Sequence, residues 1–151
     1  MTLKDREYEE DFARNKSLRF NIRLLIRHPT IDPDRITSTL QLTPDHSAMV
    51  GTVRKTPVGT ILPGLHRDSV WSHSFRVERN RFFFSDAAKL INKLEPHQAF
   101  LVQLDESGGS TTLILDLPGD TNIGDVFSWH EMARLSALRI ALGIEVFPEF
   151  N

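Results

Sequence analysis

The chain has 151 residues, 40% hydrophobic and 25% charged, which is enough for one well-packed domain and excludes a chain that is disordered throughout. Its formal net charge of -2 excludes a strong general attraction to nucleic acid or to an anionic membrane surface, so neither is an expected partner. The absence of cysteine excludes disulfides, thiolate nucleophiles and cysteine zinc sites, and it favours a reducing compartment, which we take to be the cytoplasm.

The N-terminal segment, residues 1–16, is dense in charged residues and has no apolar run. We expect it to be partly flexible, and we assign residues 17–151 to a single α+β domain. No later stretch approaches the roughly 18 consecutive apolar residues that a membrane-spanning helix needs. From Leu18 to Ile26 every second residue is apolar, which predicts a strand with one buried face.

A short helix is predicted after this strand. Asp32 can cap its first amide groups, Pro33 suits its first position, and Pro44 disfavours its continuation. A second strand is predicted from Val70 to Arg79, with Trp71, His73 and Phe75 on one face. Apolar residues at helical spacing then predict a helix that starts with Ser85 as its cap and stops at Glu95-Pro96.

The C-terminal third predicts a hairpin, a helix and a last strand. The hairpin joins Ala99–Asp105 to Ser110–Leu117 through a glycine-rich turn. The helix is predicted from Ser128 to Leu142, with Met132, Leu135, Leu138 and Leu142 inward and Gly143 as its stop, and the strand from Ile144 to Phe147. The predicted fold is therefore α+β, with a ferredoxin-like βαββαβ core after an N-terminal β-α unit, in all about five strands and three helices.

Several motifs are those of a known family. They are the run from Ile36 to Pro44 (ITSTLQLTP), the glycines and basic residues that follow it, the segment Val70-Trp71-Ser72 and the run from Leu135 to Phe147 (LSALRIALGIEVF). In these motifs the chain resembles the bacterial family called domain of unknown function 4279, over Leu18 to Phe147. The resemblance implies a small bacterial cytoplasmic domain without an assigned activity, and it supplies no catalytic residues.

The long connection from Thr43 to Ser69 is the most unusual segment, because long loops in compact domains are commonly functional or disordered. It has no acidic residue between His46 and Arg67, and it contains several glycines. We interpret it as a candidate anion-binding loop, since basic side chains neutralise phosphate or carboxylate groups and glycines allow close backbone approach. The candidate ligand-binding residues are Arg54, Lys55, His66, Arg67 and, on the neighbouring strand, His73. The alternative is a surface loop that only connects two elements.

Two other patterns concern the arginines of the first strand and the histidines. Arg19, Arg23 and Arg27 form a stripe along one face of the first strand, joined by Arg76 of a neighbouring strand. We interpret this stripe as an ordinary solvated face, with contact to nucleic acid or an acidic partner as the alternative. The six histidines show no recognised metal-ligand spacing, so we expect neither a metal nor a cofactor.

Two functional hypotheses follow from these patterns. The first is a non-enzymatic binding or interaction domain, of an immunity or regulatory type, which recognises a protein partner or a small anionic ligand through the basic loop. The alternative is an enzyme for a phosphorylated or carboxylated small molecule, with Arg54, Lys55 and Arg67 as anion clamp and His66 or His73 as general acid or base. The lack of a nucleophile motif favours the first hypothesis, and neither predicts an oligomeric state.

Overall fold

A computed structural model describes residues 20–75, 83–119 and 122–148 of the chain. Its strands are β1 (Asn21–His28), β2 (His46–Ala48), β3 (Val53–Lys55), β4 (Ile61–Leu65), β5 (Ser69–Phe75), β6 (Ser110–Pro118) and β7 (Ile140–Phe147). Its helices are α2 (Pro33–Leu40), α3 (Phe83–Leu94), α4 (Gln98–Glu106) and α5 (Trp129–Ala137), with a short 3-10 turn at Glu95–His97 between α3 and α4. The α+β class is confirmed.

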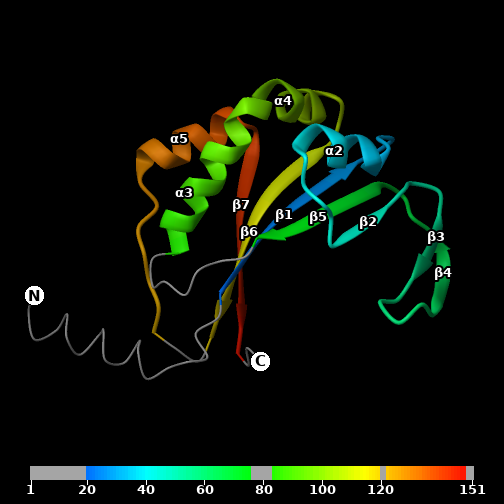
Figure 1. Cartoon of the computed structure of the whole chain (residues 1–151). Helices are drawn as coiled ribbons and strands as arrows, with labels where there is room; N and C mark the ends of the chain where they lie inside the picture. Colours follow the sequence, from blue (N-terminus) through cyan, green and yellow to red (C-terminus); the bar gives the residue numbers. More distant parts are fainter. Residues whose placement is uncertain (1–19, 76–82, 120–121, 149–151) are drawn as a thin grey trace, which may run out of the picture.

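Five of the strands form an open sheet in the order β2-β5-β1-β6-β7. The central strand β1 pairs antiparallel with β5 and β6, and β2 pairs antiparallel with β5. β7 runs parallel to β6, which is possible because α5 forms the crossover between them. Figure 1 shows the helices on one side of this sheet, whereas the separate hairpin β3-β4 projects from the β2-β5 end, away from the helices.

The predicted alternation along the first strand is confirmed where the structure describes it. Ile22, Leu24 and Ile26 are fully buried on the face that the helices cover, so the intervening side chains point to the opposite face. On β6, Leu113 and Leu115 are buried beside them. Burial of each such side chain stabilises the fold by about 1.5–3 kcal/mol, and this row forms the centre of the core.

The predicted start of the first helix is also confirmed. The Asp32 carboxylate accepts a hydrogen bond from the Asp34 N–H at 2.9 Å, and Pro33 is the first residue of α2. The helix ends at Leu40, and Gln41 adopts a left-handed conformation with φ 54° as its C-terminal cap. The helix is therefore held at both ends by local backbone chemistry.

The second predicted strand corresponds to β5, and its predicted end at Arg79 lies outside the described residues. The following helix begins at Phe83, so the prediction of Ser85 as its cap is wrong. A distant side chain binds its first turn instead, because the Phe84 N–H donates to Asp125 Oδ2 at 3.0 Å. The predicted inward face of α3 is confirmed, since Ala87, Leu90, Ile91 and Leu94 are buried.

The predicted hairpin over 99–117 is wrong in its first half, because residues 98–106 form helix α4. Its buried residues, Leu101 and Leu104, are three apart, as expected of one helical face. The glycine-rich turn ends this helix: Gly108 has φ 93°, and the Gly109 N–H donates to the Leu104 carbonyl at 2.8 Å. A helix thus stands where the βαββαβ order needs a strand, and the ferredoxin-like arrangement is not the observed one.

The C-terminal helix is shorter than predicted. α5 starts after Ser128, whose hydroxyl accepts from the Glu131 N–H at 3.1 Å as the capping pattern indicates, but it ends at Ala137. Arg139, and not Gly143, takes the left-handed conformation that turns the chain, with φ 57°. β7 therefore starts at Ile140, and Met132 and Leu142, which we predicted to face inward, are exposed.

The segment from Thr43 to Ser69 is not one long loop. It contains β2, which extends the sheet, and the hairpin β3-β4, so the seven described strands exceed the predicted five. Within the hairpin, Val53 pairs with Leu65 and Lys55 with Ile61, and the register shifts between these pairs. None of the described helices is long and apolar enough to cross a membrane.

Candidate anion-binding site

A hollow of about 500 Å³ lies on the side of the sheet that faces away from the helices. Its floor comes from β1, β2 and β5, and its wall comes from the hairpin β3-β4 and the residues directly after it. The lining residues are Arg23, Leu25, Arg27, His46, Arg54, Leu65, His66, Arg67, Asp68, Val70 and Ser72. Most of its polar side chains are basic.

The pleat of the sheet explains the floor. Arg23, Leu25 and Arg27 alternate with the buried residues of β1, so all three emerge on the same open face. Val70 and Ser72 of β5 reach this face for the same reason, since they alternate with buried Trp71. The sequence thus builds a core and a basic surface from a single strand.

Backbone hydrogen bonds fix the wall. The His66 carbonyl accepts from the Gly51 N–H at 2.8 Å, and the His66 N–H donates to the Thr52 carbonyl at 2.9 Å. These two bonds tie both ends of the hairpin together beside the sheet. The Arg54 guanidinium donates to the Pro63 carbonyl at 3.3 Å, which holds this side chain along the hairpin.

The two floor arginines are engaged with carboxylates. Arg23 Nε lies 3.1 Å from Asp116 Oδ2, and its Nη2 lies 2.8 Å from Glu145 Oε2, which ties β1 to β6 and β7. Burial alone lowers the pKa of Arg23, but the hydrogen bonds and charges of Asp116 and Glu145 outweigh burial and raise it. Arg27 Nη1 lies 3.4 Å from Asp68 Oδ1.

The two arginines of the wall, Arg54 and Arg67, differ from the floor arginines in their ion pairing. Among the described residues, no carboxylate forms an ion pair with Arg54 or Arg67. Both side chains are exposed, and both line the hollow together with His46 and His66. The hollow therefore holds positive charge that no described carboxylate neutralises, in a concave surface where charged groups are less screened than on a flat one.

The structure brings three of the five predicted site residues together: Arg54, His66 and Arg67. Lys55 is the next residue along β3 and does not line the hollow. His73 belongs to the helix-side face of β5, where its Nδ1 lies 2.5 Å from the Thr43 carbonyl oxygen and its ring lies 4.7 Å from that of Phe75. His73 therefore makes its contacts on the helix-side face of the sheet, whereas the hollow lies on the opposite face.

Sequence reasoning missed the contribution of the first strand to the hollow. The sequence pattern predicts Arg23 and Arg27 to be part of a separate solvated stripe. The signal that connects them with the loop is their position on the open face of β1. Arg19 and Arg76 lie outside the described residues. In the part of the chain that the structure describes, no three histidine, aspartate or glutamate side chains come close enough to hold a metal ion.

Comparison with known proteins gives a family match. The model of the family described as domain of unknown function (DUF4279) matches residues 18–146, which is most of the chain. Neither the comparison with curated proteins nor the comparison with solved structures finds a match. The match agrees with the resemblance seen in the sequence motifs.

Proposed function

The chain belongs to the DUF4279 family of domains of unknown function, and from that premise we propose that it is a binding domain whose basic hollow recognises a phosphate or carboxylate group of a small molecule. One observation carries this proposal: Arg54 and Arg67 line the same hollow without a carboxylate partner among the described residues. An anion would supply the partner that both lack.

The size and chemistry of the hollow support a small ligand. Its volume of about 500 Å³ lies within the range of roughly 300–1,000 Å³ that is typical of small-molecule sites. Guanidinium groups match phosphate and carboxylate oxygens with two parallel hydrogen bonds. Leu25, Leu65 and Val70 add an apolar part to the lining, which suits the carbon skeleton of an organic anion.

The ion pairs of the floor support a division of roles. Arg23 is held by Asp116 and Glu145, so it shapes the floor and does not need the ligand as a partner. Arg54 and Arg67, on the hairpin wall, would make the direct contacts. The absence of cysteine supports the further proposal that the protein works in a reducing compartment, the cytoplasm.

A calorimetric titration with pyrophosphate and citrate tests the proposal. We expect binding of at least one of these anions to the wild type, and we expect Arg67→Ala to weaken it about 10- to 100-fold, since a hydrogen bond to a charged group contributes about 1.5–3 kcal/mol. Lys55→Ala is the matched control, because it removes the same charge from the same hairpin outside the hollow. An equal loss of anion affinity in both variants would mean that the anion responds only to the net charge of the hairpin, and it would overturn the proposal.

A second candidate is an enzyme that acts on the same class of ligand. It is supported by His46 and His66, which line the hollow with the arginines and could transfer protons. His73 does not support it, because it lies on the other face of the sheet. Turnover of phosphorylated or carboxylated compounds that is lost in His66→Ala, while anion binding persists, would favour the enzyme over the binding domain.

A further inference from the structure

A second surface lies at the opposite end of the sheet, where β7 is the outermost described strand. Leu142, Ile144 and Val146 share the helix-side face with buried Leu113, Leu115 and Leu117 of β6, yet they are 37%, 54% and 62% exposed. The helices cover the start of β7 and leave its second half open. An apolar row at a sheet edge is a site for pairing with another strand.

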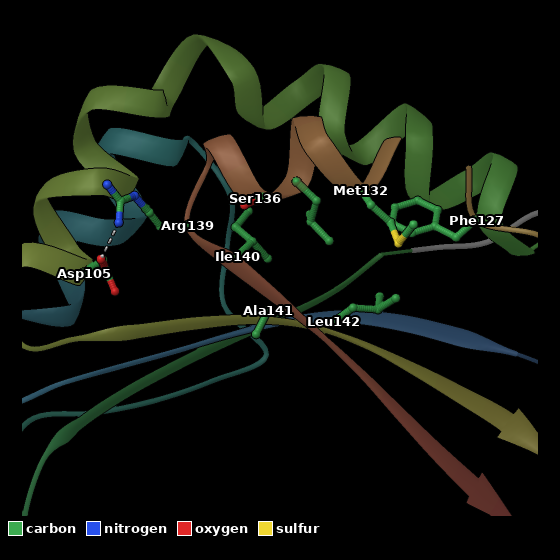
Figure 2. Close-up of a pocket in the computed structure, with 9 residues that line it drawn as sticks. Asp105, Phe127, Met132, Ser136, Arg139, Ile140, Ala141 and Leu142 are labelled. Atoms are coloured by element: carbon green, nitrogen blue, oxygen red, sulfur yellow. Dashed lines mark ion pairs between the residues drawn. The ribbon is translucent and has the colours of Figure 1, made fainter. Parts of the chain in front are cut away.

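A cleft beside α5 continues this surface. It has a volume of about 430 Å³, lies between α5 and β7, and is lined by the exposed Met132 and by Phe127. Figure 2 shows Met132 and Phe127 above this cleft, Ala141 and Leu142 below it, and the Arg139–Asp105 ion pair at its far end. The cleft opens beside the exposed row of β7.

Within the residues that the structure describes, this edge lacks the lysines, prolines and bulges that usually prevent pairing. Isolated edge strands are protected by lysine, proline, bulges or short length. β7 has eight residues, contains no lysine or proline, and pairs with β6 without a register shift. Its one charged side chain, Glu145, is held by Arg23 at 2.8 Å, so it leans over the sheet and away from the edge.

From these features we infer that β7 pairs antiparallel with β7 of a second copy of this chain, around a two-fold axis at Ile144, and so joins two five-stranded sheets into one. A two-fold axis perpendicular to the sheet keeps the helix-side faces of both copies together. In an antiparallel pair, directly opposite residues lie on the same face of the sheet, whereas neighbours along one strand lie on opposite faces. The axis must therefore pass between two copies of the same residue, and not between two neighbouring positions of the strand.

The sequence of β7 selects the position of that axis. Centred on Ile144, the pairing sets Ile144 against itself, Leu142 against Val146 of the second copy, and Gly143 against Glu145 of the second copy. The apolar row is thus complementary to itself, and each glutamate faces a residue without a side chain. Centring on Glu145 would set two like charges against each other, which is destabilising.

The same axis brings an apolar residue of the second copy to the cleft between α5 and β7. Because the strands run in opposite directions, the exposed Val146 of the second copy lies beside Leu142, at the mouth of the cleft beneath Met132. Each copy thus offers an apolar residue to a cleft of the other, as an isologous interface requires. This surface is separate from the basic hollow, which lies at the β2-β5 end of the sheet.

Cysteine cross-linking of the full chain tests the register directly, because the natural sequence has no cysteine. Ile144→Cys should form a disulfide-linked dimer under mild oxidation, since directly opposite Cβ atoms lie about 4.5–5.5 Å apart. Leu142→Cys alone should not, because the two copies of position 142 are four residues, roughly 13 Å, apart along the strands. Leu142→Cys combined with Val146→Cys should restore cross-linking.

Light scattering supplies the complementary readout. The wild type should have twice the 17.2 kDa mass of one chain, and Ile144→Lys should be a folded monomer by circular dichroism. Val58→Lys, at a side chain 89% exposed in the β3-β4 turn, is the matched control and should remain dimeric. A monomeric wild type, a dimeric Ile144→Lys, or equal cross-linking of Leu142→Cys and Ile144→Cys overturns the inference.

Discussion

The indole N–H of Trp71 donates a hydrogen bond to the Thr37 hydroxyl at 3.0 Å, and it joins the central part of β5 to helix α2. Trp71 is 0% exposed, so its side chain is buried where β5 meets α2. The Thr37 hydroxyl, which is half-buried, is thus the hydrogen-bond acceptor for a buried indole. The pair therefore fixes the position of α2 over the sheet.

Thr37→Val keeps the shape of the side chain and removes the acceptor. The buried indole N–H then has no partner, and we expect the free energy of unfolding to fall by about 1–3 kcal/mol. Trp71→Ala should cost more, about 3–5 kcal/mol, because it leaves a cavity. Urea denaturation measures both changes, and Ser38→Val on the exposed side of α2 is the control. Equal stability of Thr37→Val and the wild type would contradict the role of this bond.

His28 should make stability depend on pH. Its Nδ1 accepts hydrogen bonds from the N–H groups of Thr30 and Ile31 at 3.0 and 2.9 Å, so Nε2 carries the proton and faces Ser107 Oγ at 2.8 Å. A proton on Nδ1 would point at these two N–H donors and break both hydrogen bonds, so the charged form of His28 is disfavoured in the folded protein. Burial first, and then the positive charge of Arg35, lower the pKa of His28 in the folded protein.

The sign of the effect follows from this lowered pKa. The unfolded chain binds a proton near the ordinary histidine pKa of about 6.5, while the folded protein resists it. The contribution of His28 to stability is therefore complete above pH 6.5 and decreases as the pH falls from there toward the folded pKa. Urea denaturation at pH 7.5, 6.0 and 5.0 should show a steeper decrease for the wild type than for His28→Gln. Parallel curves would refute this assignment.

Asp125 should act as a distant cap of α3. Its Oδ2 accepts from the Phe84 N–H at 3.0 Å and its Oδ1 accepts from the Val126 N–H at 2.8 Å, while the Phe84 and Phe127 rings stack with centroids 4.9 Å apart. We expect Asp125→Ala to lower the free energy of unfolding by about 0.5–2 kcal/mol, as loss of a cap does. Asp125→Asn retains an acceptor and should cost less. An Asn variant as unstable as the Ala variant would count against the capping role.

The elements predicted well are those with strong local signals. The strict alternation of apolar and polar residues around Ile22 and Leu24 fits a strand and does not fit a helix. Asp32-Pro33 gives the first helix both a side-chain cap and a suitable first residue. The run from Ala99 to Asp105 failed because its short apolar pattern fits either a strand or one face of a helix. In the structure this run is a helix whose Leu101 and Leu104 are buried, and it follows α3 and the 3-10 turn at Glu95–His97 directly.

The candidate site was only partly visible in the sequence because it depends on long-range pairing. The basic character of Arg54, His66 and Arg67 could be read from composition. Their meeting with Arg23 required β5, which follows the hairpin, to pair with β1, and no local pattern shows which strands become neighbours. Lys55 illustrates the opposite case, since its charge resembles that of Arg54 but the hairpin turns it away from the hollow.

Chemical-shift mapping by NMR with pyrophosphate tests whether the basic hollow is the anion-binding site, because it reports where an anion binds without assuming which residues hold it. We expect the largest shifts on the amides of Arg54, His66 and Arg67 and on their neighbours in β1, with little change in α2 and α5. A titration without shifts at millimolar pyrophosphate and citrate, or with its largest shifts around the cleft beneath Met132, would contradict this expectation.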